Sequence, residues 1–286
     1  VAPFDFDDQD PHSQRLMHAS DYTAFDIQKE DVRRSRQAYF ANISYIDDKV
    51  GQIMEVLENT RQLDNTIIIF VSDHGDMLGE RGLWFKMSFF EGSARVPLMM
   101  AGPNITPGLY TDPVSSLDVT PTVADLAGIS MEEVQPWTDG MSLCSMLDGK
   151  ARTEPVLMEY AAEGSYAPLV CIREGKWKYT YCTLDPEQLF DLEADPKELT
   201  NLAADPACAE QMEAFRVQRD ARWNLDAFDS AVRESQARRW IVYEALRNGS
   251  YFPWDYQPLQ KASERYMRNH MDLNELEDKQ RFPRGE

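Results

Sequence analysis

Positive charge is scarce in this chain of 286 residues. It holds 29 Lys and Arg against 49 Asp and Glu, which gives a formal net charge of −20 at pH 7. A protein that binds duplex nucleic acid needs a basic surface to release the counterions of the phosphates. An anionic membrane surface would repel the chain for the same reason. The composition therefore argues against nucleic-acid and membrane partners.

Long apolar runs are also missing. The longest of them, such as Thr66 to Val71, span about one strand and fall well short of the roughly 20 residues that a transmembrane helix needs. Hydrophobic residues make up 43% and charged residues 27% of the chain, which is typical of a folded globular protein and excludes wholesale disorder. The length suits one large domain or two ordinary ones.

Cysteine is sparse, and the four cysteines form no Cys-x-x-Cys pair and no zinc spacing. This usage predicts reduced, structural thiols in a cytoplasmic protein. Cys171 and Cys182 flank a predicted hairpin, so a disulfide between them is left open. No signal peptide is visible, and the first residue is Val1 rather than Met. We therefore expect the chain to begin inside a longer gene product.

The spacing of apolar residues predicts an α/β fold. Six apolar residues from Tyr39 to Leu57 recur at intervals of three and four, which predicts a helix from Lys29 with one stripe that faces a core. The run from Thr66 to Val71 is apolar on both faces and predicts an inner strand of a parallel sheet. The preceding residues 1–28 are polar and turn-rich, and we expect a surface segment there. Further elements are predicted as strands over 97–101 and 155–160 and a capped helix over 116–128.

The pattern changes near residue 166, where an antiparallel hairpin is predicted with its turn at Glu174 and Gly175. The tail of residues 249–286 is rich in aromatic residues, which indicates that it docks against the core or another subunit. The hairpin spans 169–182, and a strand over 187–192 and helices over 206–248 follow it. We expect three parts: a large α/β domain within 1–165, a small α+β subdomain over 166–248, and an extended C-terminal tail over 249–286.

Two candidate metal ligands follow the predicted strand directly. Asp73 and His74 stand at its carboxyl end, where open α/β sheets gather their ligand sites. A carboxylate oxygen suits calcium, magnesium or manganese, and an imidazole adds preference for a softer ion. Two ligands bind an ion weakly, so others must come from elsewhere. A capping aspartate and a loop histidine are the alternative interpretation.

A lone cation stands nearby without an evident nucleophile. Lys86 lies in the aromatic stretch 82–91 and can serve as a point charge for a phosphate or sulfate oxygen. The alternative is a lysine whose head lies in water. Ser72 lacks a Gly-x-Ser-x-Gly elbow, and no cysteine stands in an activating motif. The chain therefore offers metal ligands and a cation, but no group to attack a substrate.

At these residues the chain resembles the sulfatases of the alkaline phosphatase superfamily. Within this family it is similar to the choline sulfatases, and the resemblance covers the whole chain but only the C-terminal part of such an enzyme. It implies an alkaline-phosphatase-like α/β sandwich with a mostly parallel central sheet, plus a small C-terminal antiparallel-sheet subdomain and a helical tail. The stretches that carry the resemblance are residues 69–80, 82–86, 89–92, 95–98, 158–163, 254–259 and 267–273.

The resemblance implies roles for four residues. Asp73 and His74 would supply part of a divalent-metal site that usually holds calcium. Many relatives carry Asn where His74 stands, so magnesium and manganese also stay open. Lys86 would be the catalytic and substrate-binding cation on a sulfate oxygen. Glu163 would be an anionic partner of the quaternary ammonium of choline, with an exposed loop glutamate as the alternative.

The resemblance also implies a nucleophile and two aspartate ligands that this sequence lacks. The nucleophile is a formylglycine made in a Cys/Ser-x-Pro-x-Arg motif, which does not occur here. We therefore expect the intact enzyme to hydrolyse choline-O-sulfate to choline and sulfate, and this segment alone to be inactive. The alternatives are an arylsulfatase or phosphonate monoester hydrolase of the same fold, and a non-catalytic binding or assembly fragment. The tail would make homo-oligomer contacts, and Trp254, Tyr256 and Tyr266 would offer aromatic faces.

Overall fold

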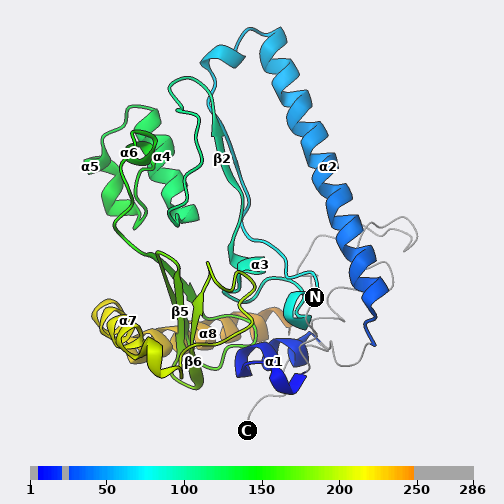
Figure 1. The fold of residues 1–286 in the computed structure, drawn as a ribbon, viewed down its shortest axis with the longest axis vertical. Coiled ribbons are helices and arrows are strands. Elements are labelled where there is room, and N and C mark those ends of the chain that lie inside the picture. The colour runs from blue at the N-terminus through cyan, green and yellow to red at the C-terminus, as the bar shows by residue number, and fades with distance from the viewer. Residues whose placement is uncertain (1–5, 21–25, 248–286) are drawn as a thin grey trace.

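The computed structural model describes residues 6–20 and 26–247 and combines helices with two antiparallel sheets (Figure 1). The strands are β1 (Ile68–Val71), β2 (Leu98–Ala101), β3 (Val156–Tyr160), β4 (Leu169–Glu174), β5 (Trp177–Cys182) and β6 (Asp185–Asp191). The helices are α1 (Pro11–Ala19), α2 (Lys29–Asn59), α3 (Glu91–Ala94), α4 (Val119–Leu126), α5 (Met131–Val134), α6 (Cys144–Leu147), α7 (Ala209–Arg222) and α8 (Leu225–Arg247).

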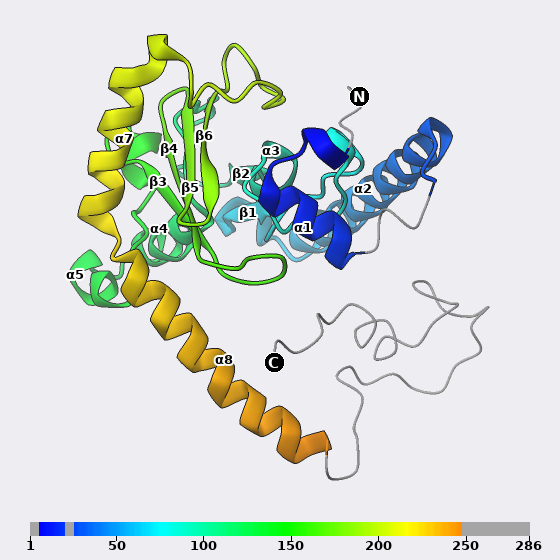
Figure 2. The ribbon, with the colours of Figure 1, turned by 90° about the horizontal axis from the view of Figure 1, so that it is seen from below.

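The larger sheet has the strand order β3-β4-β5-β6 with every pair antiparallel. The predicted hairpin over 169–182 is confirmed, and Gly175 takes the left-handed backbone (φ 52°) at its turn. Helix α7 covers one face of this sheet (Figure 2). There the Tyr179 and Phe215 rings stack with centroids 5.4 Å apart, and both side chains are fully buried. This sheet and α7 form a core of their own.

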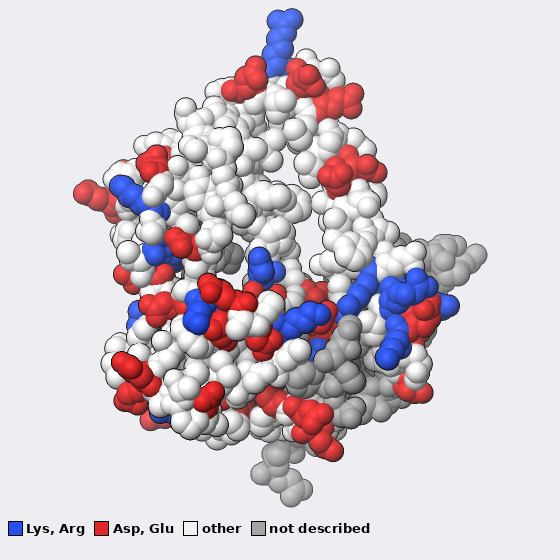
Figure 3. Space-filling model, viewed as in Figure 1, with Lys and Arg blue, Asp and Glu red and all other residues white. Residues whose placement is uncertain are grey.

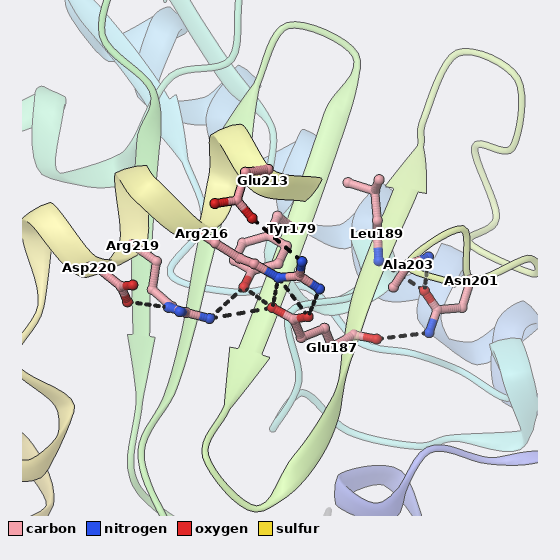
Figure 4. A network of polar contacts seen from close by, with 9 residues as sticks. All are labelled: Tyr179, Glu187, Leu189, Asn201, Ala203, Glu213, Arg216, Arg219 and Asp220. Carbon is pink, nitrogen blue, oxygen red and sulfur yellow. Dashed lines mark hydrogen bonds and ion pairs between the residues drawn. The ribbon is translucent and has the colours of Figure 1, made fainter. Parts of the chain in front are cut away.

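A polar network lies at the edge of that core (Figure 4). The Glu187 carboxylate accepts a hydrogen bond from the Tyr179 hydroxyl at 2.6 Å and pairs with Arg216 of α7 at 2.5 Å. Arg219, one turn further along α7, donates to the Tyr179 hydroxyl at 3.0 Å. Charged hydrogen bonds of this kind fasten α7 to the sheet.

The smaller sheet pairs β1 with β2 in antiparallel register, so that Ile68 lies opposite Ala101 and Val71 opposite Leu98. The run 66–71 was predicted to be an inner strand of a parallel sheet. Among the described residues, β1 instead has a neighbouring strand on one side, β2, and the pair is antiparallel. Its burial agrees with that position, since its residues range from half-buried to exposed. Apolar residues on both faces identified the strand correctly, but they did not identify its neighbour.

Helix α2 begins at the predicted residue, and its stripe is exposed instead of facing a core. The helix has 31 residues and none of them is buried. Ile43 is 48% and Ile53 60% exposed. Figure 3 shows open gaps between this helix and the strands beside it. The stripe therefore has no apolar surface against it in the part of the chain that the structure describes.

Residues 1–28 are not simply a surface segment, because they contain α1. Asp10 caps the helix by accepting from the Ser13 backbone N–H, and Pro11 follows at the first position. His12 and Leu16 are buried, at 4% exposure each. The Asp-Pro pair was the sequence signal for this helix start, and it was missed.

The four cysteines are all free, so the disulfide left open by the sequence does not form. Cys171 lies opposite Thr180, and Cys182 opposite Leu169, so the two are not cross-strand partners. Within 6–20 and 26–247, no helix combines the length and the apolar character needed to cross a membrane. The aromatic tail 249–286 lies outside the described residues. The division at 165 and 248 stays a prediction, although β3 joins the sheet from before residue 166.

Candidate active site

The loop that carries Asp73 and His74 leaves the end of β1 and packs against the short helix α3. The Gly75 N–H donates to the Ser93 carbonyl at 2.7 Å. A Cβ at Gly75 would lie 2.2 Å from the Gly92 carbonyl oxygen. Glycine is thus required at residue 75 by this close approach of two backbones, and not by a left-handed conformation.

A strained turn connects this loop to Lys86. Met77 N–H donates to the Phe85 carbonyl at 2.7 Å, which brings the two arms of the turn together. Leu78, Arg81 and Phe85 all have positive φ, between 46° and 64°. Non-glycine residues in this region cost free energy and gather at functional sites. The turn is held by apolar contacts of Met77, Leu83 and Phe90 with Phe190 of β6.

The turn returns Lys86 to His74. The Lys86 Nζ lies 2.8 Å from His74 Nε2, and His74 Nδ1 lies 2.8 Å from the Gly75 carbonyl oxygen. An ammonium donates and a carbonyl accepts, so His74 is neutral with its proton on Nδ1 and its lone pair on Nε2. His74 Nε2 is also 3.4 Å from the Asp73 carboxylate, but a neutral imidazole makes no ion pair there.

Asp73 offers an ionised carboxylate to solvent. The backbone N–H of His74 donates to Asp73 Oδ1 at 2.9 Å, and this bond lowers the pKa of Asp73 below its ordinary value. The side chain is 83% exposed. Asp73 lines an open cleft between the two sheets, together with Arg95 and Arg173.

The Asp73 carboxylate and His74 Nε2 lie close enough to be considered together as ligands of a divalent ion. The donor set is a carboxylate oxygen and the unprotonated Nε2 of an imidazole, which fits such an ion as part of its ligands. Among residues 6–20 and 26–247, no cluster of three or more His, Cys, Asp or Glu side chains is arranged to hold a metal. A metal site at Asp73 and His74 therefore stays a prediction.

Glu163 lies in the loop after β3 and is exposed. The Tyr160 hydroxyl donates to the Glu163 carboxylate at 3.1 Å and to its carbonyl oxygen at 2.9 Å. Burial, and then the Glu163 charge, raise the pKa of Tyr160, so its hydroxyl keeps the proton that it donates. The structure thus orients Glu163 through Tyr160, and no direct contact joins it to the group formed by Asp73, His74 and Lys86.

Sequence reasoning missed a buried cluster of charged side chains between β5 and α3. Lys178 of β5 lies 2.8 Å from Glu198 and 2.6 Å from Glu91 and also donates to the Phe89 carbonyl. Both Lys178 and Glu198 are 2% exposed. The Glu198 carboxylate accepts from the Glu91 backbone N–H at 2.7 Å. A lysine is rarely fully buried, so Lys178, although it lies between two aromatic residues of the predicted strand, gave no signal for this cluster.

Three family models match the chain. The model described as sulfatase matches residues 6–129, that of N-sulphoglucosamine sulphohydrolase, C-terminal, matches residues 79–221, and that of choline sulfatase enzyme C terminal matches residues 230–282. The matches together extend over most of the sequence.

Two curated proteins illustrate the similarity. The chain is 70% identical to the choline-sulfatase of Rhizobium meliloti (strain 1021) over 289 residues, which is 100% of this chain and 56% of that protein. It is 38% identical to arylsulfatase K of Gallus gallus over 63% of the chain and 37% of that protein. The chain thus spans about half the length of the first relative and less of the second.

Solved structures carry the same fold. A putative sulfatase from Bacteroides thetaiotaomicron matches with a TM-score of 0.66 and 26% identity, over 83% of this chain and 53% of that one. The phosphonate monoester hydrolase of Agrobacterium radiobacter matches with a TM-score of 0.59 and 29% identity, over 68% of this chain and 42% of that one. Neighbours of this kind support a sulfatase-like arrangement of the described elements.

Proposed function

The chain belongs to the sulfatase family, and on that premise we propose that it forms part of an enzyme that hydrolyses choline-O-sulfate to choline and sulfate. The 70% identity to a choline-sulfatase along the entire chain carries the proposal. The convergence of Lys86, His74 and Asp73 at the end of β1 supports it, because a cation and two metal donors suit a sulfate ester.

Lys86 is the proposed catalytic cation, which binds an oxygen of the sulfate group. Its exposed ammonium reaches His74 across the loop, and the same reach would serve an oxyanion bound beside His74. A fixed positive charge stabilises the negative charge that grows on sulfate oxygens as the ester bond breaks. The Ser93 hydroxyl holds the backbone by donating to the Lys86 carbonyl.

Asp73 and His74 are the proposed ligands of a divalent ion, calcium first and magnesium or manganese as alternatives. The ion, when bound, supplies Lewis-acid polarisation of the sulfate group. The lone pair of His74 Nε2 now faces Lys86 at 2.8 Å, so His74 can bind a cation only when Lys86 swings away. Such a movement would direct Lys86 toward the substrate. The formylglycine nucleophile remains part of the proposal, although its motif does not occur in these 286 residues.

Glu163 is the proposed partner of the choline ammonium. A quaternary ammonium has no N–H to donate, so a carboxylate and aromatic faces recognise it by charge. Glu163 is exposed and is oriented by the Tyr160 hydroxyl, as the role requires.

Several finer features belong to the same proposal. We propose that β1 joins a mostly parallel central sheet, that the chain divides at residues 165 and 248, and that the tail 249–286 makes homo-oligomer contacts. We also propose a cytoplasmic location, which agrees with four free cysteines. Strand register, sedimentation with and without the tail, and cell fractionation test these features separately.

The deciding experiment measures product release by the full-length protein encoded by the gene. Choline sulfate, an aryl sulfate and a phosphonate monoester are compared, with calcium, magnesium or manganese restored after chelation. We expect preference for choline sulfate. Activity on the other esters alone would mean an arylsulfatase or a phosphonate monoester hydrolase. Inactivity of a preparation that carries formylglycine would favour a non-catalytic binding or assembly role.

A pair of lysine variants tests the site. Lys86→Ala should lower kcat by about 100-fold or more, the loss typical of one oxyanion-stabilising group. Lys49→Ala is the matched control, because Lys49 is an exposed lysine of α2 that bonds Gln52. Its kcat should be unchanged, and equal losses in both variants would contradict the role of Lys86.

A further inference from the structure

Helix α1 contacts both loops that carry the proposed substrate-binding residues. His12 Nε2 lies 2.7 Å from the carbonyl oxygen of Met87, the residue after Lys86. His12 Nδ1 lies 3.3 Å from the carbonyl oxygen of Gly164, the residue after Glu163. One buried imidazole thus bridges two loops that are far apart in the sequence.

The bridge is asymmetric. A neutral imidazole has one N–H, and the shorter contact places it on Nε2, which donates to Met87. The Gly164 carbonyl is held by Arg15, one turn along α1, whose Nε donates to it at 2.6 Å. Arg15 is fixed in turn by a bidentate pair with Asp185, at 2.9 and 2.5 Å. α1 therefore grips the Lys86 turn with His12 and the Glu163 loop with Arg15.

The packing around the bridge leaves little freedom. His12 is 4% exposed, and its ring lies edge-on to Tyr160 with centroids 5.5 Å apart. Gly164 has φ 74°, and a Cβ there would lie 2.8 Å from Leu16 of α1. Tyr160 also donates to the carboxylate of Glu163. The helix, the aromatic ring and the loop form one rigid contact.

We infer that His12 is a positioning residue that sets the separation between Lys86 and Glu163, and so the preference for a substrate that spans both. The inference rests on the proposed function of these two residues. His12 does not reach the substrate itself, because both ring nitrogens face backbone carbonyls and the side chain is buried. A shift of about 1 Å between binding groups is enough to change rates substantially.

The test compares three substitutions in the full-length protein. His12→Phe keeps the ring and removes both nitrogens, His12→Gln places an amide N–H near the position of Nε2, and His12→Asn places one near Nδ1. The readout is the ratio of kcat/KM for choline sulfate to kcat/KM for neohexyl sulfate, in which carbon replaces the quaternary nitrogen. This ratio does not depend on the fraction of folded enzyme.

We expect the ratio to fall about tenfold in His12→Phe and His12→Asn, the effect of one lost buried hydrogen bond, and to return to within about threefold of the unmodified protein in His12→Gln. His18→Gln, an exposed histidine of the same helix, should leave it unchanged. An unchanged ratio in all three His12 variants would overturn the inference. If His12→Phe does not fold, the difference between Gln and Asn decides in the same way.

A second readout separates this inference from the proposed function. Hydrogen exchange of the unmodified chain and of His12→Asn is compared at the amides of residues 86–88 and 164–165, with β5 as internal reference. We expect exchange of 86–88 to be about tenfold faster in the variant, since the bond to the Met87 carbonyl is lost. Equal exchange would overturn the bridge even if choline sulfate is hydrolysed. Faster exchange without such activity would support the bridge and reject the proposed function.

Discussion

Two regions with similar apolar patterns are buried very differently. In the sheet–helix unit, which comprises β3, β4, β5, β6 and α7, Tyr179, Leu189 and Phe215 are fully buried. In the long-helix region, which comprises α2, β1 and β2, no residue of α2 is buried and Phe40 is 67% exposed. A periodic apolar stripe therefore predicts a helix or strand and the face that it would bury. It does not show that another surface covers that face.

The attachment of α2 shows what holds it in place. Arg36 donates to the Leu78 carbonyl at 3.0 Å and pairs with Glu80 at 2.9 Å. Val32 lies against Gly79, where an added Cβ would approach its side chain to 3.0 Å. These contacts fasten the N-terminal third of α2 to the strained turn before Lys86. The rest of its stripe is an exposed apolar surface of the kind that marks an interaction face.

Truncation of one phenylalanine in each region tests most directly whether the two regions differ in burial. Phe215→Ala should lower the free energy of unfolding by about 4 kcal/mol, because it removes a buried ring that stacks on Tyr179. Phe40→Ala should change it by less than about 1 kcal/mol, since most of that ring is exposed. Urea unfolding of the chain measures both. Similar losses would mean that Phe40 of α2 is covered in solution.

The sequence predicted the elements better than their neighbours. Periodicity located α2, β1 and the hairpin, because spacing reports local geometry. The pairing of β1 with β2 and the burial of His12 depend on contacts across long stretches of sequence, which periodicity does not encode. Asp73, His74 and Lys86, which the sequence singled out, form a chain of close contacts in the structure, whereas their roles toward a metal and a sulfate group stay predictions.

The remaining parts of the site illustrate the same limit. Glu163 is oriented by a tyrosine three residues away, a local feature that spacing leaves unspecified. Lys178 and Glu198 are buried charges, and their types suggest exposure until the partners are known. Residue chemistry predicted the side chains to which we assign binding and catalytic roles. The side chains that position them depend on tertiary packing, which the sequence pattern does not show.

The buried charge cluster around Lys178 of the sheet–helix unit provides a second test. Lys178→Met should lower the free energy of unfolding by about 3 kcal/mol, because it removes the buried cation that the carboxylates of Glu198 and Glu91 share. Lys176→Met is the control, since Lys176 is 41% exposed and pairs with Asp191, and its loss should be much smaller because solvent screens the pair.

The pH dependence of the Lys178→Met loss checks the cause. Burial raises the pKa of Glu198 even with Lys178 beside it, and without the lysine that pKa should rise further. The folded variant then binds a proton that the unfolded chain releases, so its stability rises as pH falls toward the ordinary carboxyl range. The loss should be largest at neutral pH and smaller near pH about 5. A loss that is constant with pH would point to packing instead of charge.

The smallest expected effect comes from the network that fastens α7 to the sheet (Figure 4). Burial alone would raise the pKa of Glu187, but hydrogen bonds from Arg216 and Tyr179 and the charge of Arg219 outweigh it, so the pKa is lowered. A carboxylate with a lowered folded pKa stabilises the protein above its unfolded pKa of about 4.3, and that contribution is lost as pH falls through the folded value. Glu187→Gln should therefore cost about 1–2 kcal/mol at pH 7 and progressively less in acid.

The matched carboxylate on the long helix should behave differently. Glu30 pairs with Arg33 at 2.7 Å, and both side chains are largely exposed, at 49% and 68%. Solvent screens such a pair, so Glu30→Gln should leave the free energy of unfolding nearly unchanged at any pH. Urea unfolding of both variants at a series of pH values makes the comparison. If Glu30→Gln matched Glu187→Gln in size and pH dependence, burial would not be what separates the two regions. If a pH-dependent loss of stability appears in Glu187→Gln alone, buried polar contacts as well as apolar burial stabilise the sheet–helix unit, and α2 lacks both.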